Sequence, residues 1–342
     1  MDSTKRKEEH IDLCLNHKVG YRKSNGFENY DFVHEALTEV VIDDIKFGTQ
    51  FLGKTISYPF MISSMTGGTH SAKILNENLS IAANKLNIPI GVGSQRSLLE
   101  SSQYLETYKI IRESAPNVPV LSNIGAAQLV QLDDITRLNR IIEIISADGL
   151  VIHLNPLQEL LQKEGEYNFN GLLKKISMVK NNIEIPIIVK EVGSGISQLS
   201  ARKLLDIGIN TIDVSGSGGT SWAAVELMRN PKPENDYFTE WGLSTSYCVR
   251  EIAKLKKEFD FILISSGGIN NFVDGAKSLA LGADMFASAR IILQTLDQSG
   301  INGIIELINN WFVGIKKIMF LTGSSSIAEL QKNKLKRKED LI

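Results

Sequence analysis

The sequence predicts a single α/β domain, a (β/α)₈ TIM barrel with an N-terminal arm and an elaborated loop after the sixth strand. Eight short apolar runs recur between residues 59 and 287, and stretches with helical periodicity separate them. Such alternation predicts parallel strands joined by right-handed crossovers. Eight units favour a closed barrel over an open sheet, and α/β barrels commonly reach the length of this chain, 342 residues, as one domain.

The apolar runs are too short for helices, and they lack the strict alternation that marks a strand with one solvated face. Strands covered on both faces by helices have this composition. The eight predicted strands are Pro59–Ser63, Pro89–Val92, Pro119–Ser122, Gly149–His153, Pro186–Lys190, Thr211–Val214, Phe261–Ser265 and Asp284–Ala287. The helical stretches include Ile74–Leu86, Leu98–Ser114, Gln131–Ser146, Gly171–Asn181, Gln198–Leu205 and Val273–Leu281.

Three regions follow from this layout. Residues 1–58 are expected to form an arm with a short helix and a hairpin, residues 59–331 the barrel, and residues 332–342 a charged tail, interpreted as a solvated helix end. The longest gap between strands runs from Val214 to Phe261 and contains Trp222 and Trp241. We interpret it as a loop over the end of the barrel where active sites lie.

Composition limits the classes of function. The 37 basic and 39 acidic residues give a net charge of -2, so nothing in the bulk charge favours nucleic acid or an anionic membrane as a partner. Two distant cysteines, Cys14 and Cys248, indicate neither a disulfide framework nor a metal site. No apolar run approaches the roughly 20 residues of a membrane helix, and residues 11–19 are too polar for a signal peptide. We therefore expect a soluble cytoplasmic protein.

Polar, glycine-rich segments follow nearly every predicted strand. Glycine and serine often do no more than turn the chain, but their recurrence at one end of eight strands favours a site at the carboxyl end of the barrel. At the last two strands, Gly267, Gly268, Ser288 and Ala289 resemble a barrel phosphate cradle, and the hydroxyl groups of Ser215 and Thr220 could add donors. This pattern alone does not choose between a phosphorylated cofactor and a phosphorylated substrate.

Lys190 ends a buried strand, where a lysine is costly unless it is paired or functional. One interpretation is an internal ion pair with a neighbouring acid. The other is a cation that faces the polar edge of a flavin ring and stabilises its anionic reduced form.

A second anion site is the hypothesis for Arg6, Lys7 and His10, which lie within about one helical turn, together with Arg96 after the second strand. The alternative is an exposed, solvated basic face. Glu159, in the segment after the fourth strand, is the best carboxylate for Mg²⁺, because a magnesium–diphosphate site needs only one or two. Its alternative is a carboxylate at a helix N-terminus, which Pro156 favours.

These motifs resemble one family across nearly the whole chain, the type 2 isopentenyl diphosphate isomerases. The discriminating motifs are Arg6-Lys7 followed by Glu9-His10, and the stretch His153–Glu159, whereas other FMN barrels share only the glycine-rich strand ends. The resemblance further includes Gly26-Phe27, Asp31–Glu35, Ser64–Gly68, Gly93–Arg96, Ser122–Gly125, Lys190–Gly193, Ser215–Trp222 and Ser265–Gly268. Ser288-Ala289-Arg290 matches the family only loosely.

The resemblance implies FMN, Mg²⁺, and isopentenyl or dimethylallyl diphosphate as ligands, NADPH as reductant, and a homo-oligomer, either a tetramer or an octamer. It places FMN against Ser64, Met65, Thr66, Ser94, Asn123, Lys190, Ser215, Thr220, Gly267, Gly268, Ser288 and Ala289. It places the substrate against Arg6, Lys7, His10, Ser94, Gln95, Arg96, His153, Asn155 and Gln158, and the metal on Glu159.

The implied reaction moves a double bond by adding a proton to one carbon and removing one from another. No acidic pair at a suitable spacing supplies a strong acid, so reduced flavin could serve as acid and base. The predicted catalytic residues are Gln158, which positions or relays, Lys190 and His153.

The main rival is an FMN-dependent oxidoreductase of the hydroxy-acid oxidase or dihydroorotate dehydrogenase type. Such an enzyme needs a base, for which His153 is available, or a thiol, and neither cysteine lies at a strand end. A flavin-binding module without catalysis is a third possibility, but the polar residues at the strand ends exceed what flavin binding needs.

Overall fold

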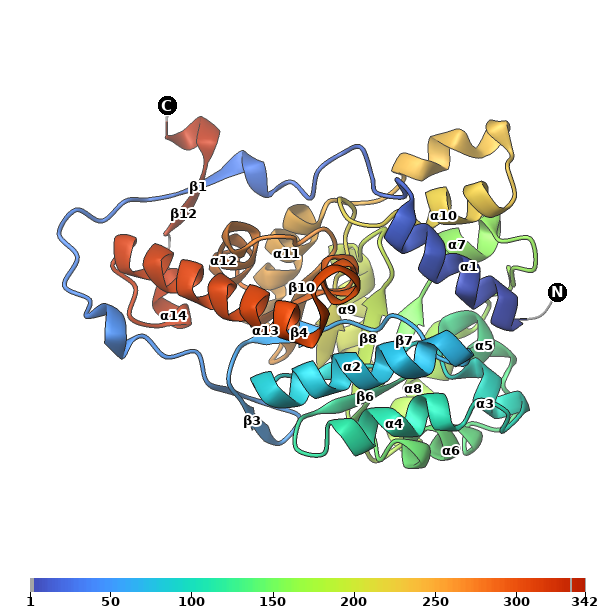
Figure 1. Cartoon of the computed structure of the whole chain (residues 1–342). Coiled ribbons are helices and arrows are strands. Elements are labelled where there is room, and N and C mark those ends of the chain that lie inside the picture. Colours follow the sequence, from blue (N-terminus) through green and yellow to red (C-terminus); the bar gives the residue numbers. More distant parts are fainter. Residues whose placement is uncertain (1–2, 333, 342) are drawn as a thin grey trace.

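The computed structural model describes residues 3–332 and 334–341 and contains the closed parallel barrel that the sequence predicts (Figure 1). The strands pair in chain order from β4 to β11, and β11 pairs with β4 to close the ring. All eight predicted strands are confirmed, with small differences at their ends. They are β4 Phe60–Ile62, β5 Ile90–Gly91, β6 Val120–Gly125, β7 Gly149–Leu154, β8 Ile187–Glu191, β9 Thr211–Asp213, β10 Ile262–Ser266 and β11 Met285–Ser288.

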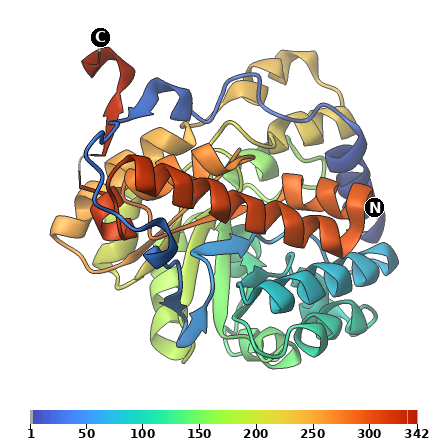
Figure 2. The same cartoon turned by 60° about the vertical axis from the view of Figure 1, so that its left-hand side comes forward.

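Helices surround the barrel and also lie at the carboxyl ends of its strands. They are α2 His70–Leu86, α3 Arg96–Glu100, α4 Glu106–Ser114, α5 Ala126–Gln131, α6 Arg137–Ile144, α7 Pro156–Leu161, α8 Leu172–Asn182, α9 Gln198–Asp206, α12 Phe272–Ala280, α13 Arg290–Leu321 and α14 Ile327–Leu330. Figure 2 shows α13 lying lengthwise along one side of the barrel. It was not predicted, and its helical geometry is interrupted at Gly300, where φ is 64°.

Two predicted helices differ from those of the structure. The stretch Leu98–Ser114 becomes α3 and α4, because Ser101 is extended and its hydroxyl accepts the backbone N–H of Gln103. The stretch Gln131–Ser146 is helical only in α6, since α5 lies before it and ends at Gln131. Before α6, the carboxylate of Asp134 accepts the backbone N–H of Thr136 at 2.9 Å. Serine and aspartate side chains compete with helical hydrogen bonds in this way, and periodicity alone does not reveal it.

The N-terminal arm contains the predicted helix, α1 Ser3–Asn16, and the predicted hairpin, formed by β2 Thr49–Phe51 and β3 Lys54–Ile56. The hairpin closes the amino end of the barrel. Phe51 and Ile56 are buried against the inward side chains of the strands, among them Met61 and Leu121. Short 3₁₀ helices, η1 Phe27–Asn29 and η2 Ile42–Asp44, complete the arm.

The charged tail is not a helix end, which corrects the sequence-based interpretation. Its strand β12, Leu335–Arg337, pairs antiparallel with β1, Tyr30–Phe32, and a 3₁₀ turn, η5 Lys338–Asp340, follows. An unpaired strand edge of the arm is a ready partner for another strand. The buried ammonium of Lys277 on α12 fixes this part of the arm to the barrel by donating to the carbonyls of Phe27 and Tyr30.

The loop after the sixth strand is elaborated, as predicted. It contains α10 Trp222–Arg229, η3 Pro233–Glu240, α11 Thr245–Ala253 and η4 Lys254–Lys257. Both views show α10 and η3 at the same end of the molecule as α1 (Figures 1 and 2). The helix α10 packs against α1 and α7. No helix within the described residues has the length and apolar character needed to cross a membrane.

Candidate active site

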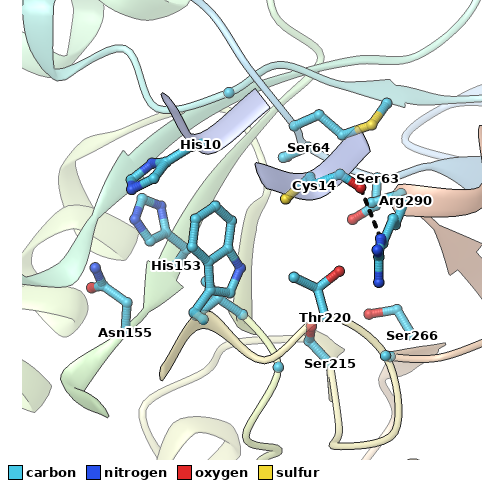
Figure 3. Close-up of a pocket in the computed structure, with 18 of the residues that line it drawn as sticks. His10, Cys14, Ser63, Ser64, His153, Asn155, Ser215, Thr220, Ser266 and Arg290 are labelled. Carbon is cyan, nitrogen blue, oxygen red and sulfur yellow. Dashed lines mark hydrogen bonds between the residues drawn. The ribbon is translucent and has the colours of Figure 1, made fainter. Parts of the chain in front are cut away.

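A cavity of about 650 Å³ lies at the carboxyl ends of the barrel strands, a size typical of ligand pockets. All but one of the residues that the sequence predicts for the site line it. These are Arg6, Lys7, His10, Ser64, Met65, Thr66, Ser94, Arg96, Asn123, His153, Asn155, Gln158, Glu159, Lys190, Ser215, Thr220, Gly267, Gly268, Ser288 and Ala289. Figure 3 shows His10, His153 and Asn155 on one side, and Ser215, Thr220 and Ser266 on another.

Gln95 is the exception. It is fully buried and does not line the cavity. Its amide donates to the carbonyl of Ile141 on α6, and its side-chain oxygen accepts the Ser122 hydroxyl and the Asn123 backbone N–H. These bonds engage both ends of the amide, so Gln95 links two strands to a helix and is placed to support Asn123 rather than to contact substrate.

The glycines after β10 form a cradle with the segment after β9. A Cβ on Gly268 would lie 2.4 Å from the carbonyl oxygen of Gly218, and one on Gly267 would lie 2.0 Å from that of Gly216. Both glycines have positive φ, 105° and 72° for Gly267 and Gly268, which other residues adopt only with strain. A side chain at Gly268 would therefore displace the chain itself as well as a ligand.

The donors of this cradle suit a phosphate. Among the residues that the structure describes, the backbone N–H groups of Gly219 and Gly268 make no hydrogen bond within the chain, and both residues face the cavity. The helix α13 begins directly after Ala289, so its N-terminus is directed at the same place. Ser288 contributes less as a donor than expected, because its hydroxyl donates to the carbonyl of Ile269 at 2.7 Å.

Lys190 and His153 lie side by side in the register of β8 and β7. The ammonium of Lys190 donates to the carbonyl of Glu191 at 2.6 Å and lies 3.6 Å from the carboxylate of Asp213, a buried acid on β9. The structure thus shows the ion pair with a neighbouring acid, and Lys190 also lines the cavity. Its role beside a flavin ring stays a prediction.

His153 is a neutral imidazole. Its Nδ1 lies 2.7 Å from the amide oxygen of Asn123, which can only accept, so Nδ1 carries the proton and Nε2 does not. Burial, with a smaller contribution from the Lys190 ammonium, lowers the pKa of His153 to about 3. A ring that resists protonation this strongly is a poor general base.

The arm helix presents one face to the cavity, with Arg6, His10 and Cys14 at intervals of four residues. Lys7 has a different environment from the one expected. Its ammonium donates to the carbonyls of Gly67 at 2.7 Å and Ser94 at 3.2 Å, and also to the Tyr108 hydroxyl. These contacts hold α1 to the segments after β4 and β5.

Glu226 on α10 is a buried acid beside the cavity that the sequence analysis missed. It is 1% exposed, and its carboxylate lies 3.0 Å from Nε2 of His10 and 2.6 Å from the guanidinium of Arg229. It also accepts the side-chain amide of Gln158 at 3.2 Å. Burial opposes the ionisation of Glu226, but these partners outweigh it and lower the pKa. The carboxylate therefore joins α1, α7 and α10 beside the cavity.

Glu159 lies in the first turn of α7, as the helix-terminus alternative predicts, and also lines the cavity. Its two carboxylate oxygens accept the amide of Asn155 and the backbone N–H of Glu166, each at 2.9 Å. Within the described part of the chain, no group of three or more His, Cys, Asp or Glu residues could hold a metal ion. A cation here would need most of its ligands from water and a bound phosphate, which Mg²⁺ accepts.

Other cavity-lining residues were not predicted, and two have signals that could have identified them. Trp222 begins α10, and its ring lies edge-on to His10 at 5.0 Å between centroids; it stands in the aromatic loop noted in the sequence. Cys14 follows His10 by one helical turn, and burial raises its thiol pKa to about 11. Arg290 donates to the carbonyls of Cys14 and His17, so it anchors the end of α1 (Figure 3).

Comparison with known proteins places this chain in a family. Residues 156–337 match the family model described as FMN-dependent dehydrogenase. A protein of Pelodictyon phaeoclathratiforme named isopentenyl-diphosphate delta-isomerase is 41% identical, with 96% of both chains covered. One of the same name from Vibrio parahaemolyticus is 40% identical, covering 96% of this chain and 98% of its own.

The chain belongs to the isopentenyl-diphosphate delta-isomerase family. The family resemblance recognised in the sequence is thereby confirmed. Solved structures show how this family member shares its fold with other flavoproteins. A flavocytochrome b2 mutant superposes with a TM-score of 0.70 at 19% identity, covering 98% of this chain and 83% of that chain. A mandelate oxidase superposes with a TM-score of 0.66 at 17% identity, covering 96% and 94%. These two likenesses concern the fold alone.

Proposed function

We propose that this protein interconverts isopentenyl diphosphate and dimethylallyl diphosphate, using FMN, Mg²⁺ and NADPH as the initial reductant. Membership of the isomerase family supports this proposal. The observation that carries it is the pairing of two anion-binding regions in one cavity. The glycine cradle after β9 and β10 suits one phosphate, and cationic side chains of the arm and of α3 line the same cavity. One region is then available to a cofactor phosphate and the other to a substrate diphosphate.

In this proposal the cradle of Gly267, Gly268 and the start of α13 holds the phosphate of FMN. Reduced FMN, when bound, supplies the acid and base that transfer the proton. Arg6, His10 and Arg96 hold the substrate diphosphate, because guanidinium groups and imidazole N–H groups donate to phosphate oxygens. Lys7 acts mainly by keeping α1 in place, given its contacts with Gly67 and Ser94.

The remaining side chains orient the reactants and exclude water. The amide of Gln158 is fixed by Glu226, and the ring of His153 is fixed by Asn123, so both positions are set before substrate binds. Glu159, oriented by Asn155, would hold Mg²⁺, which would offset the negative charge of the diphosphate. Lys190 supplies positive charge next to the cofactor. We further propose that the protein acts in the cytoplasm as a homo-oligomer, a tetramer or octamer.

A turnover count tests the proposal. The FMN-loaded protein is reduced under nitrogen with NADPH, and product is counted against NADPH consumed. The proposal expects no activity with oxidised FMN, many products per NADPH after reduction, and deuterium in the product formed in deuterated water. The oxidoreductase alternative requires about one reductant per product, and that ratio would overturn the isomerase proposal. The low pKa of His153 weighs against its use as the base such an oxidoreductase needs.

The metal assignment has its own test in Glu159→Gln, which removes the charge and keeps the shape. The proposal expects the magnesium concentration for half-maximal activity to rise about tenfold or more, with FMN retained. If Glu159 only caps α7, the magnesium response stays unchanged, and stability falls by less than about 1 kcal/mol.

A further inference from the structure

Asp213 is a fully buried acid for which the proposed reaction has no role. It ends β9, is 0% exposed and does not itself line the cavity. In the parallel register it stands next to Lys190 on β8, which in turn stands next to His153 on β7. The three residues form a row across adjacent strands at the base of the cavity.

The two carboxylate oxygens of Asp213 have different environments. Oδ1 accepts the hydroxyl of Ser266 at 2.5 Å and the backbone N–H of Ser215 at 3.3 Å. Oδ2 is buried and makes no hydrogen bond with any residue that the structure describes. It lies 3.6 Å from the ammonium nitrogen of Lys190. The Ser266 and Ser215 contacts thus hold the carboxylate so that its second oxygen faces the lysine.

A buried carboxylate is costly without a charge partner, and so is a buried ammonium. Lys190 and Asp213, with side chains 7% and 0% exposed, offset each other. An ammonium carries three N–H donors. The carbonyl of Glu191 takes one, and Asp213 engages at most one more, so a donor remains for a ligand in the cavity that Lys190 lines.

Two other titratable groups adjoin Lys190. His153, from β7, is neutral, because burial lowers its pKa to about 3. The carboxylate of Glu191, on the same strand as Lys190, instead accepts the backbone N–H groups of residues 192–195. Burial raises the pKa of Glu191 to about 7, so it titrates in the neutral range. Asp213 is therefore the acid whose position is matched to Lys190.

We propose that Asp213 is a positioning residue that keeps Lys190 charged and directed into the cavity, and that it thereby sets the balance between the reduced and oxidised states of the bound flavin. With the Asp213 carboxylate on one side, the Lys190 ammonium has a fixed position from which its positive charge acts on the cofactor. Without the carboxylate, the buried ammonium loses the charge that offsets its desolvation and releases its proton at a lower pH. This inference rests on the proposed binding of FMN.

The test is the midpoint potential of FMN bound to the holoprotein, measured against pH by equilibration with a reference dye. We compare wild type, Asp213→Asn, Lys190→Met and the double variant between about pH 6 and pH 9, a range that covers the titration of a perturbed lysine. Asp213→Asn should show a bend that is absent from wild type, at the pH where Lys190 loses its proton. The bend should disappear in the double variant, which should match Lys190→Met. Lys190 is one of the charges that lower the pKa of Glu191, so the Glu191 titration is compared within two pairs, wild type with Asp213→Asn and Lys190→Met with the double variant.

Activity provides a second measurement. With FMN content retained, kcat of Asp213→Asn should fall about tenfold or more, while KM for the diphosphate changes less than about threefold. A potential whose pH dependence equals that of wild type would overturn the proposal. If Asp213→Asn alone does not fold, the double variant decides, since removing both charges should restore folding. A double variant as unstable as the single one would also refute it. Failure of the isomerase proposal is a separate result, in which the wild-type protein reacts without converting isopentenyl diphosphate to dimethylallyl diphosphate.

Discussion

The substitution Glu226→Gln tests whether one buried carboxylate holds the arm over the cavity. Glu226 accepts N–H groups from Gln158 of α7 and Arg229 of its own helix, and its carboxylate lies 3.0 Å from Nε2 of His10 on α1. Glutamine keeps the shape but has a single acceptor oxygen, and its NH₂ group would have to face one of these donors. At least one contact is lost, and Arg229 loses a charge partner in a buried place.

The size of the effect follows from burial. Removing one partner of a buried ion pair costs about 3–5 kcal/mol. We expect the lower limit, about 3 kcal/mol, because Glu9 still accepts from Arg229 at 2.9 Å. An unfolding entropy of about 2.1 cal/mol/K per residue over 342 residues totals about 0.7 kcal/mol/K. The melting temperature should therefore fall by about 4 °C.

The sign of the pH dependence is also set. The pKa of Glu226 is lowered in the folded protein from the ordinary value of 4.5. Its stabilisation is fully present above pH 4.5 and is lost as the pH falls through the lowered pKa. The difference in melting temperature between wild type and variant should thus be largest near neutral pH and should shrink in acid.

The assays are thermal unfolding, limited proteolysis of the arm and KM for the diphosphate. In Glu226→Gln, cleavage within α1 should accelerate and KM should rise about tenfold, because His10 no longer has its carboxylate partner. The matched control is Glu9→Gln, which removes a 38% exposed partner of the same Arg229 and should cost less than about 1 kcal/mol. Equal melting temperatures and equal KM values for the two variants would refute the reasoning.

Two further predictions concern the cradle and the buried histidine. Gly268→Ala places a Cβ 2.4 Å from the Gly218 carbonyl oxygen, so the purified protein should lose most of its FMN. The control is Gly53→Ala, which has a similar φ but open space around the new Cβ and should keep its FMN. Full FMN occupancy in both variants would contradict the assignment of the cradle. His153 has a pKa of about 3 when folded and 6.5 otherwise, so the unfolded chain binds the extra proton and stability falls as the pH drops below 6.5. In the apoprotein, His153→Gln should abolish about 2 kcal/mol of the loss seen at pH 5; unfolding curves with unchanged acid dependence would contradict this.

The barrel and most of its site could be predicted from local patterns. The eight strands are continuous apolar runs, and the residues after them lie together because all parallel strands of a closed barrel end on the same side. Lys190, Gly267 and Gly268 were found through this rule, since each follows or ends a strand. The arm motif at Arg6 and His10 was found through its resemblance to a family, because nothing local connects residue 10 to a barrel that begins near residue 60.

Such local patterns do not predict the direction in which a side chain points. Gln95 follows a strand end like its neighbour Ser94, yet it turns outward to Ile141 while Ser94 lines the cavity. Adjacent residues differ in this way because direction depends on the backbone torsions of a short segment and on which packing partner is near. The division of the predicted helix Leu98–Ser114 also depends on a side-chain hydrogen bond, that of Ser101.

By itself, the sequence determined the fold class, the family, and the end of the barrel at which the cavity lies. Periodic burial, glycine positions and short motifs are local properties, and they suffice for these conclusions. Only the tertiary structure decided which charges meet. The pairs Lys190–Asp213 and His10–Glu226 join residues from different elements, in the second case 216 positions apart (226 − 10). A buried charged group needs a partner that offsets the cost of its desolvation. That partner is near in space but can be far away in the sequence, so the spacing of residues along the chain does not identify it.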